Sequence, residues 1–98
     1  MNIGKKQDGG RLTLKVEGRL DTNTAPDLES ELKLDGVKEV VFDFSGLEYI
    51  SSAGLRVLMV THKAMATSSG AMKVLHPNAM VLGVFGITGL DSVFSIER

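Results

Sequence analysis

Residues 40–55 constrain the fold of this chain more than any other part of its sequence. They begin with an apolar run at 40–44, rich in β-branched and aromatic residues, which is typical of a buried central strand. After Gly54 the apolar residues recur at helical rather than alternating spacing. Ser51 and Ser52 therefore lie at a turn from a strand to a helix, which is the usual exposed edge of an α/β sheet.

A hydroxyl at the start of a helix is accessible to a partner and lies at the positive end of the helix dipole. Such a position is well suited to carry or to sense a phosphate group. At least one of Ser51 and Ser52 is also expected to cap the helix, and capping alone would explain its presence. The functional interpretation therefore needs support from elsewhere in the chain.

The remaining sequence alternates predicted strands and helices. Leu12, Leu14 and Val16 alternate with polar residues and predict a half-buried strand, and the Gly9-Gly10 turn before it predicts pairing with an edge strand. The predicted strands are 2–7, 12–17, 40–44, 71–75 and 93–96. The predicted helices run from a Thr24 cap to about Leu34, over 53–66 and over 79–87. This order indicates an α/β fold: a single domain with a mixed sheet, helices packed mainly on one face, and strands 12–17, 40–44 and 71–75 at its centre.

Charge and composition exclude several classes of function. The net charge of −1 gives no electrostatic footprint for nucleic acid or for an anionic membrane. Cysteine is absent, so disulfides, thiol catalysis and cysteine-ligated metals are excluded, and no metal or cofactor is expected. The first residues lack the apolar run of a signal peptide, and no apolar stretch approaches the roughly 20 residues of a membrane helix. We therefore expect a cytoplasmic protein that does not insert into membranes.

Three stretches of the chain, in order and at matching spacing, resemble the STAS domain family, and within it the bacterial anti-sigma factor antagonists. Residues 18–25 resemble the family's Gly-x-Leu-Asp followed by a helix start. Residues 43–55 resemble its signature Asp-[Leu/Phe]-Ser-x-Leu-x-[Phe/Tyr]-[Ile/Met]-Asp-Ser-[Ser/Ala]-Gly-Leu, and residues 70–74 with 81–90 resemble its tail. The clearest departure is Ser51, which stands where the family usually has aspartate.

The resemblance implies a binding module without enzymatic activity. In the resembling proteins, the unphosphorylated form binds an anti-sigma factor, which is a serine kinase, and so frees a sigma factor for transcription. The kinase phosphorylates the serine after the aspartate, and a serine phosphatase reverses the modification. Carried over by position, the phosphorylated residue is Ser52, and the acid in the loop beside it is Asp21. The predicted partner-binding residues are Asp21, Ser51, Ser52, Ala53 and Arg56.

Two acidic residues have simpler interpretations beside the functional ones. Asp21 is as well placed to bond backbone N–H groups of its own loop as to serve a site. Asp43 lies in the apolar strand 40–44, so we expect it to anchor the loop after the strand by hydrogen bonds rather than to take part in catalysis.

Two other functions stay open at this point. A small serine hydrolase would use the segment 50–54, which is one glycine short of a Gly-x-Ser-x-Gly elbow, with His76 as the base. A STAS subunit that is not phosphorylated, in a lipid-transport ATPase complex or a signalling assembly, would fit the serine at position 51.

Overall fold

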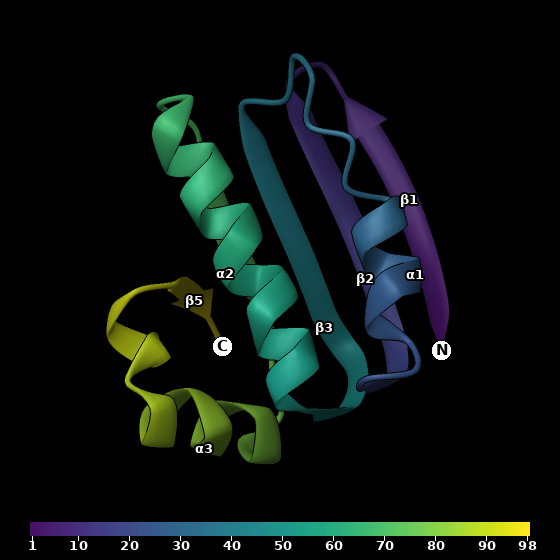
Figure 1. Cartoon of the computed structure of the whole chain (residues 1–98), viewed down its shortest axis with the longest axis vertical. Helices are drawn as coiled ribbons and strands as arrows, with labels where there is room; N and C mark the ends of the chain where they lie inside the picture. The colour runs from purple at the N-terminus through teal and green to yellow at the C-terminus, as the bar shows by residue number, and fades with distance from the viewer.

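The computed structural model describes residues 1–98 and contains five strands and three α-helices (Figure 1). The elements follow one another as β1 (Asn2–Asp8), β2 (Arg11–Leu20), α1 (Ala25–Ser30), β3 (Glu39–Ile50), α2 (Ser52–Thr67), β4 (Ala71–Leu75), α3 (Ala79–Thr88), a 3-10 turn (Leu90–Ser92) and β5 (Ser95–Glu97). The strands form one sheet in the order β1-β2-β3-β4-β5. Strand β1 pairs antiparallel with β2, and all other neighbours are parallel.

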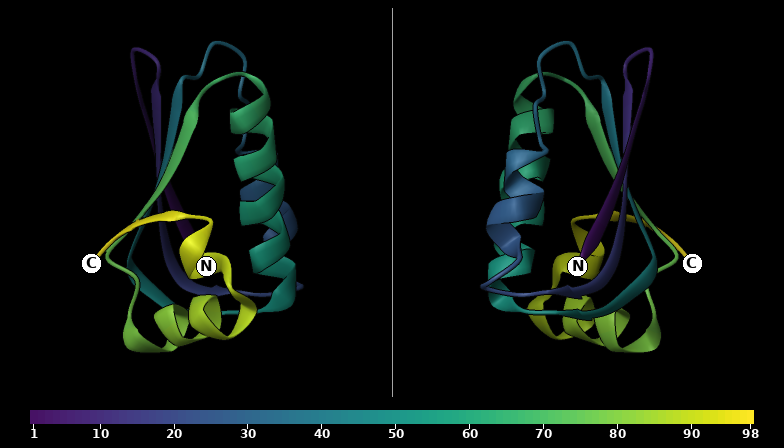
Figure 2. Two further views of the ribbon diagram at one scale, coloured as in Figure 1. Left: turned by 90° about the vertical axis from the view of Figure 1, so that its left-hand side faces the viewer. Right: turned by 90° about the vertical axis from the view of Figure 1, so that its right-hand side faces the viewer.

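The helices α1 and α2 lie against one face of the sheet, and α3 lies across one of its ends (Figures 1 and 2). No helix covers the other face. Alternate residues of β2 and β4 and of the first half of β3 point to the covered face, where they are buried. The largest fully buried side chains of the core include Leu12, Leu14, Phe42 and Phe44 of the strands, Leu58 of α2 and Phe85 of α3. The predicted mixed sheet with helices mainly on one face is confirmed, as are the central positions of β2, β3 and β4.

Strand β3 continues beyond its predicted end at Phe44 and reaches Ile50. Polar residues and a glycine interrupt the apolar pattern after Phe44, which predicted a loop there. The register with β2 shifts twice, between Lys15 and Glu17 and between Gly18 and Arg19, with an extra residue on β3 each time. These irregularities are β-bulges, which let the strand continue and twist although its apolar alternation is broken.

Helix α1 ends at Ser30, and the prediction that it extends to about Leu34 is wrong. The chain must return from the end of β2 to the start of β3 at the opposite end of the sheet (Figure 1). A helix advances about 1.5 Å per residue and an extended chain about 3.3 Å, so the return requires an extended segment. Leu32 and Leu34 still pack against the core from this segment.

The last predicted strand is shorter than expected and starts later. Helix α3 ends at Thr88. Its C-cap residue Gly89 has a φ of 76°, in the left-handed region, and the 3-10 turn that follows was not predicted. Phe94 is buried against Phe85, with ring centroids 5.6 Å apart, and β5 begins only after it. None of the helices combines the length and the apolar character needed to cross a lipid bilayer.

Candidate functional site

The predicted site residues gather at the end of the sheet where β2 and β3 terminate. Leu20 and Ile50, the last residues of these parallel strands, are partners in the register. The Ser51 N–H donates to the Leu20 carbonyl at 2.9 Å, which ties the start of α2 to the end of β2. The Asp21 loop and the two serines therefore lie at the same edge, as the topology predicts.

The Asp21 carboxylate belongs to a hydrogen-bonded turn that leads into α1. Its Oδ1 atom accepts hydrogen bonds from the backbone N–H groups of Asn23 at 3.0 Å and Thr24 at 3.2 Å. The Thr24 hydroxyl donates to the Arg19 carbonyl at 2.9 Å and accepts from the Asp21 N–H at 2.9 Å. Thr24 occupies the predicted cap position, but its side chain makes no capping bond to the helix. The structural interpretation of Asp21 is thus correct, whatever it does with a partner.

The two serines occupy the first positions of α2 in different environments. Ser51 is the N-cap residue, with φ −103° and ψ 178°, but its side chain does not cap the helix. Its Oγ atom is instead turned into the protein, where it is buried without a hydrogen-bond partner. Ser52 is the first helical residue; its side chain is exposed and makes none of the side-chain hydrogen bonds of the structure.

Close packing of Gly54 holds the first turn of α2 on the sheet. A Cβ atom at this buried residue would lie 2.7 Å from Leu20 Cγ and 2.8 Å from Ile50 Cγ1. No side chain fits at those distances without displacing a core residue. The helix start is therefore positioned by packing and backbone bonds, and the Ser52 hydroxyl is not needed for it.

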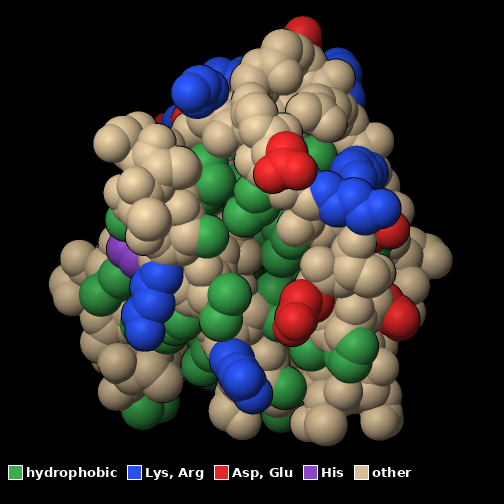
Figure 3. Space-filling view, turned by 45° about the horizontal axis from the view of Figure 1, so that its top comes forward, with side chains coloured by type: hydrophobic (Ala, Val, Ile, Leu, Met, Phe, Trp, Pro, Cys, Tyr) green, Lys and Arg blue, Asp and Glu red, His purple; other side chains and the backbone are tan.

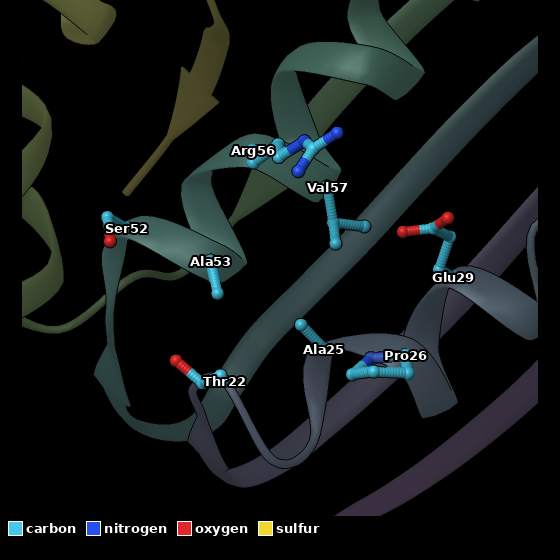
Figure 4. A pocket seen from close by; sticks show the side chains of 8 residues that line it. All are labelled: Thr22, Ala25, Pro26, Glu29, Ser52, Ala53, Arg56 and Val57. Atoms are coloured by element: carbon cyan, nitrogen blue, oxygen red, sulfur yellow. The ribbon is translucent and has the colours of Figure 1, made fainter.

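A groove of about 560 Å³ runs between α1 and α2 from this edge (Figure 4). Its lining residues are Thr22, Ala25, Pro26, Glu29, Ser52, Ala53, Arg56 and Val57. The Glu29 carboxylate and the Arg56 guanidinium face one another across it, from opposite helices. Further along the helices, a smaller apolar depression of about 100 Å³ includes Val60, which is 55% exposed. Figure 3 shows hydrophobic side chains along this face with charged side chains at both rims.

Comparison with known proteins agrees with this architecture, and the STAS domain model matches residues 2–98. This chain belongs to the STAS domain family. A Bordetella bronchiseptica protein named as an anti-sigma factor antagonist, BtrV, is 34% identical over 101 residues, covering 100% of this chain and 87% of its own. The predicted resemblance to the anti-sigma factor antagonists of the STAS family is therefore confirmed.

Solved structures share the fold of this STAS domain. A Thermotoga maritima protein described as an anti-sigma factor antagonist has a TM-score of 0.89 at 23% identity, covering 98% of this chain and 86% of that chain. The Bacillus cell fate determinant SpoIIAA, in its phosphorylated form, has a TM-score of 0.79 at 15% identity, covering 99% and 92%.

Within this STAS domain, the structure separates the predicted site residues into two groups. Ser52, Ala53 and Arg56 line the groove, whereas Asp21 and Ser51 are not among its lining residues. Sequence reasoning missed Thr22 and Glu29 as groove residues. The signal for Glu29 was present: it is on the exposed face of a predicted helix whose buried side carries Ala25 and Leu28.

Asp43 lies outside the groove. Its neighbours in β3, Phe42 and Phe44, are fully buried on the covered face, so Asp43 points to the opposite face of the sheet. Its Oδ1 atom accepts a hydrogen bond from the Ser45 N–H at 3.0 Å, at the first bulge of β3. Burial by itself raises the pKa of Asp43, but hydrogen bonds from the Ser45 backbone and side chain and the positive charge of Lys15 together lower it below its ordinary value. The prediction that Asp43 anchors the chain after it is confirmed, although that chain is a bulged strand and not a loop.

The STAS domain shows no arrangement typical of a metal site or of a serine hydrolase. No cluster of three or more His, Asp or Glu side chains could hold a metal ion. His76 follows β4, and its backbone N–H donates to the Glu97 carbonyl of β5 at 2.7 Å. Neither serine hydroxyl is hydrogen-bonded to a histidine, so the nucleophile and base of the hydrolase hypothesis are not assembled.

Proposed function

We propose that this STAS domain binds an anti-sigma factor that is a serine kinase, and that phosphorylation of Ser52 dissociates the complex. In the unphosphorylated form the domain would hold the kinase and so free a sigma factor for transcription. The names of the relatives support an anti-sigma factor as the partner. A serine phosphatase would restore the binding form, and both enzymes would act on the domain in the cytoplasm.

The observation that carries the proposal is the position of Ser52. It is the first residue of α2, its side chain is exposed, and it stands at the end of the groove between α1 and α2. A kinase can reach this hydroxyl without unfolding any element. A protein with the same fold has been solved in a phosphorylated form, which supports the tolerance of this fold for the modification.

The physical consequence of a phosphate differs between the free domain and the complex. The modification adds about −1.5 to −2 charges, and the helix dipole stabilises an anion at a helix start by about 0.3–1 kcal/mol. The domain should therefore stay folded. Buried against a partner without a matching cation, the same group would cost several kcal/mol. A difference of about 3 kcal/mol corresponds to roughly a hundredfold change in affinity, which suffices for a switch.

The proposed partner surface consists of Asp21, Ser51, Ser52, Ala53 and Arg56. Its location can be tested by mapping chemical-shift changes on addition of the cognate kinase. We expect the largest changes at the start of α2 and in the Asp21 loop. Changes confined to the opposite end of the sheet, around Asp35 and Gly36 or Ser68 and Ser69, would contradict this surface.

The phosphorylation site is tested by incubating the domain with its cognate anti-sigma kinase and Mg-ATP, followed by phosphopeptide mass spectrometry. Ser52→Ala should abolish phosphorylation and keep the fold, whereas Ser51→Ala should not abolish it. Ser52→Asp should weaken binding of the kinase because it supplies part of the phosphate charge. Phosphate on Ser51 alone would show that the register of the resemblance is wrong.

Ser51 gives the second candidate function its support, because it replaces the aspartate usual beside the acceptor in the resembling proteins. If that acid orients the hydroxyl, its loss slows phosphoryl transfer; if Asp21 suffices, the rate is unchanged. A functional cognate kinase that modifies neither serine would favour an unphosphorylated accessory subunit, in a lipid-transport ATPase complex or a signalling assembly.

A further inference from the structure

Arg56 is the charged side chain of the groove that lies on the same helix as Ser52, four residues further along. Residues at this spacing are neighbours on a helix surface, with Cβ atoms about 5–6 Å apart. Arg56 is exposed, and it takes part in none of the four ion pairs of the structure, which join Lys5 to Glu31, Arg11 to Glu39, Arg19 to Asp21 and Lys73 to Glu97. Its guanidinium is therefore available to a new anion.

The other arginine near this edge is already engaged. The Arg19 guanidinium lies 4.1 Å from the centre of the Tyr49 ring, and its Nε atom lies 3.8 Å from an Asp21 carboxylate oxygen. A cation held over an aromatic ring and beside a carboxylate loses both contacts if it moves to another anion. Arg56 has no such contacts to lose, so it is the better counter-charge for a phosphate at the start of α2.

We propose that Arg56 is the internal counter-charge of phosphorylated Ser52, and that phosphorylation turns the guanidinium away from the groove and toward the phosphate. This inference rests on the proposed phosphorylation of Ser52. In the unphosphorylated domain the guanidinium is directed toward Glu29 across the groove, but the two do not form an ion pair. Phosphorylation would then change the groove twice, by adding negative charge and by withdrawing a cation from the proposed partner surface.

Charge and geometry both favour the phosphate over Glu29. The phosphate carries about −1.5 to −2 charges against −1 for a carboxylate, and it offers three acceptor oxygens to the planar guanidinium. An anion four residues before a cation is also the favourable orientation along a helix, because it agrees with the helix dipole. Arg56 only has to change its side-chain rotamer, since both residues already lie in the first two turns of α2.

The test uses the full chain with phosphoserine incorporated at position 52 during translation, so that no kinase is needed. The second proton dissociation of the phosphate is followed by ³¹P NMR in low salt, in the otherwise unchanged chain and with Arg56→Gln, Arg56→Lys or Lys63→Gln. Lys63 is the matched control, because it is an exposed cation of the same helix, seven residues beyond Arg56. Heteronuclear NMR spectra confirm that each variant is folded.

We expect Arg56→Gln to decrease the second dissociation constant about twofold, which is the effect of a typical helical ion pair at this spacing. Arg56→Lys should keep most of the original value, Lys63→Gln should leave it unchanged, and 1 M salt should remove the difference by screening. An unchanged constant in Arg56→Gln, or an equal decrease in Lys63→Gln, would overturn the proposal. Because phosphoserine is incorporated during translation, this outcome is independent of whether a kinase modifies Ser52.

Discussion

Two junctions between a strand and a helix meet at one edge of this STAS domain, and they are stabilised in different ways. The junction before α1 is held by side-chain hydrogen bonds of Asp21 and Thr24. The junction before α2 is held by one backbone bond from Ser51 and by the close packing of Gly54 on Leu20.

The contrast between these two junctions shows how a folded domain can keep a polar group available for a partner. The Asp21 carboxylate is hydrogen-bonded within its own turn, so replacing it should lower the stability of the domain as well as any affinity for a partner. Ser52 contributes nothing visible to its junction, so it can be modified while the fold stays intact. Hydrogen bonding stabilises the first junction and packing stabilises the second, and substitutions of Gly54, Asp21 and Ser51 test this difference.

The largest effect is expected from Gly54→Ala. The added methyl group would lie less than 3.0 Å from atoms of Leu20 and Ile50. Over-packing of this kind should lower the free energy of unfolding by up to about 3 kcal/mol. Urea denaturation measures the change. The control is Gly83→Ala in α3, where nothing lies within 4 Å of the new methyl group; it should raise stability by up to about 1 kcal/mol. Equal effects of the two substitutions would show that packing does not hold the second junction.

A smaller loss is expected from Asp21→Ala. It leaves the N–H groups of Asn23 and Thr24 without their acceptor and should lower the free energy of unfolding by about 1–2 kcal/mol. Asp21→Asn keeps a carbonyl oxygen at the same place and should cost less than half as much in the same denaturation experiment. If Asp21→Asn is stable but no longer binds the kinase, the carboxylate also has a role in the partner surface. If both substitutions leave stability unchanged, the first junction does not depend on Asp21.

Ser51→Ala should raise the free energy of unfolding by up to about 1 kcal/mol. The substitution removes a buried hydroxyl that has no hydrogen-bond partner, and such groups are costly to bury. Ser52→Ala, the matched control on an exposed neighbour, should change stability by less than about 0.5 kcal/mol. Thermal unfolding of both variants gives the comparison. A loss of about 1 kcal/mol in Ser51→Ala would mean that Ser51 caps α2 in solution.

The smallest effect concerns Asp43, which accepts a backbone N–H two residues ahead, as Asp21 does. Because its pKa is lowered in the folded state, Asp43 stabilises the fold at pH values above about 3.9, its ordinary value in unfolded chains. That contribution is lost as the pH falls through the lowered pKa. The original chain should therefore lose more stability than Asp43→Asn between pH 5 and pH 2, measured by urea denaturation at each pH. Parallel pH profiles would contradict this role.

Local sequence patterns predicted the type and order of all five strands and three α-helices. They failed where the ends of elements depend on the rest of the molecule. The polar residues after Phe44 predicted a loop, but β2 beside them supplied hydrogen-bond partners, and the strand continued through two bulges. The helix propensity of residues 31–34 was overridden, because the chain had to span the length of the sheet before β3.

The sequence was sufficient to predict that Asp21 and the two serines meet at one edge of the sheet. Parallel strands end at the same edge of a sheet, so the strands predicted at 12–17 and 40–44 lead to one edge, where Asp21 and the serines follow them. The local environment of each side chain at that edge depends on the tertiary structure. Whether a hydroxyl is buried, as in Ser51, or exposed, as in Ser52, depends on rotamers and on the packing of distant residues. Glu29 and Arg56 likewise face one another only because α1 and α2 pack side by side, and no local sequence pattern predicts the distance between two helices.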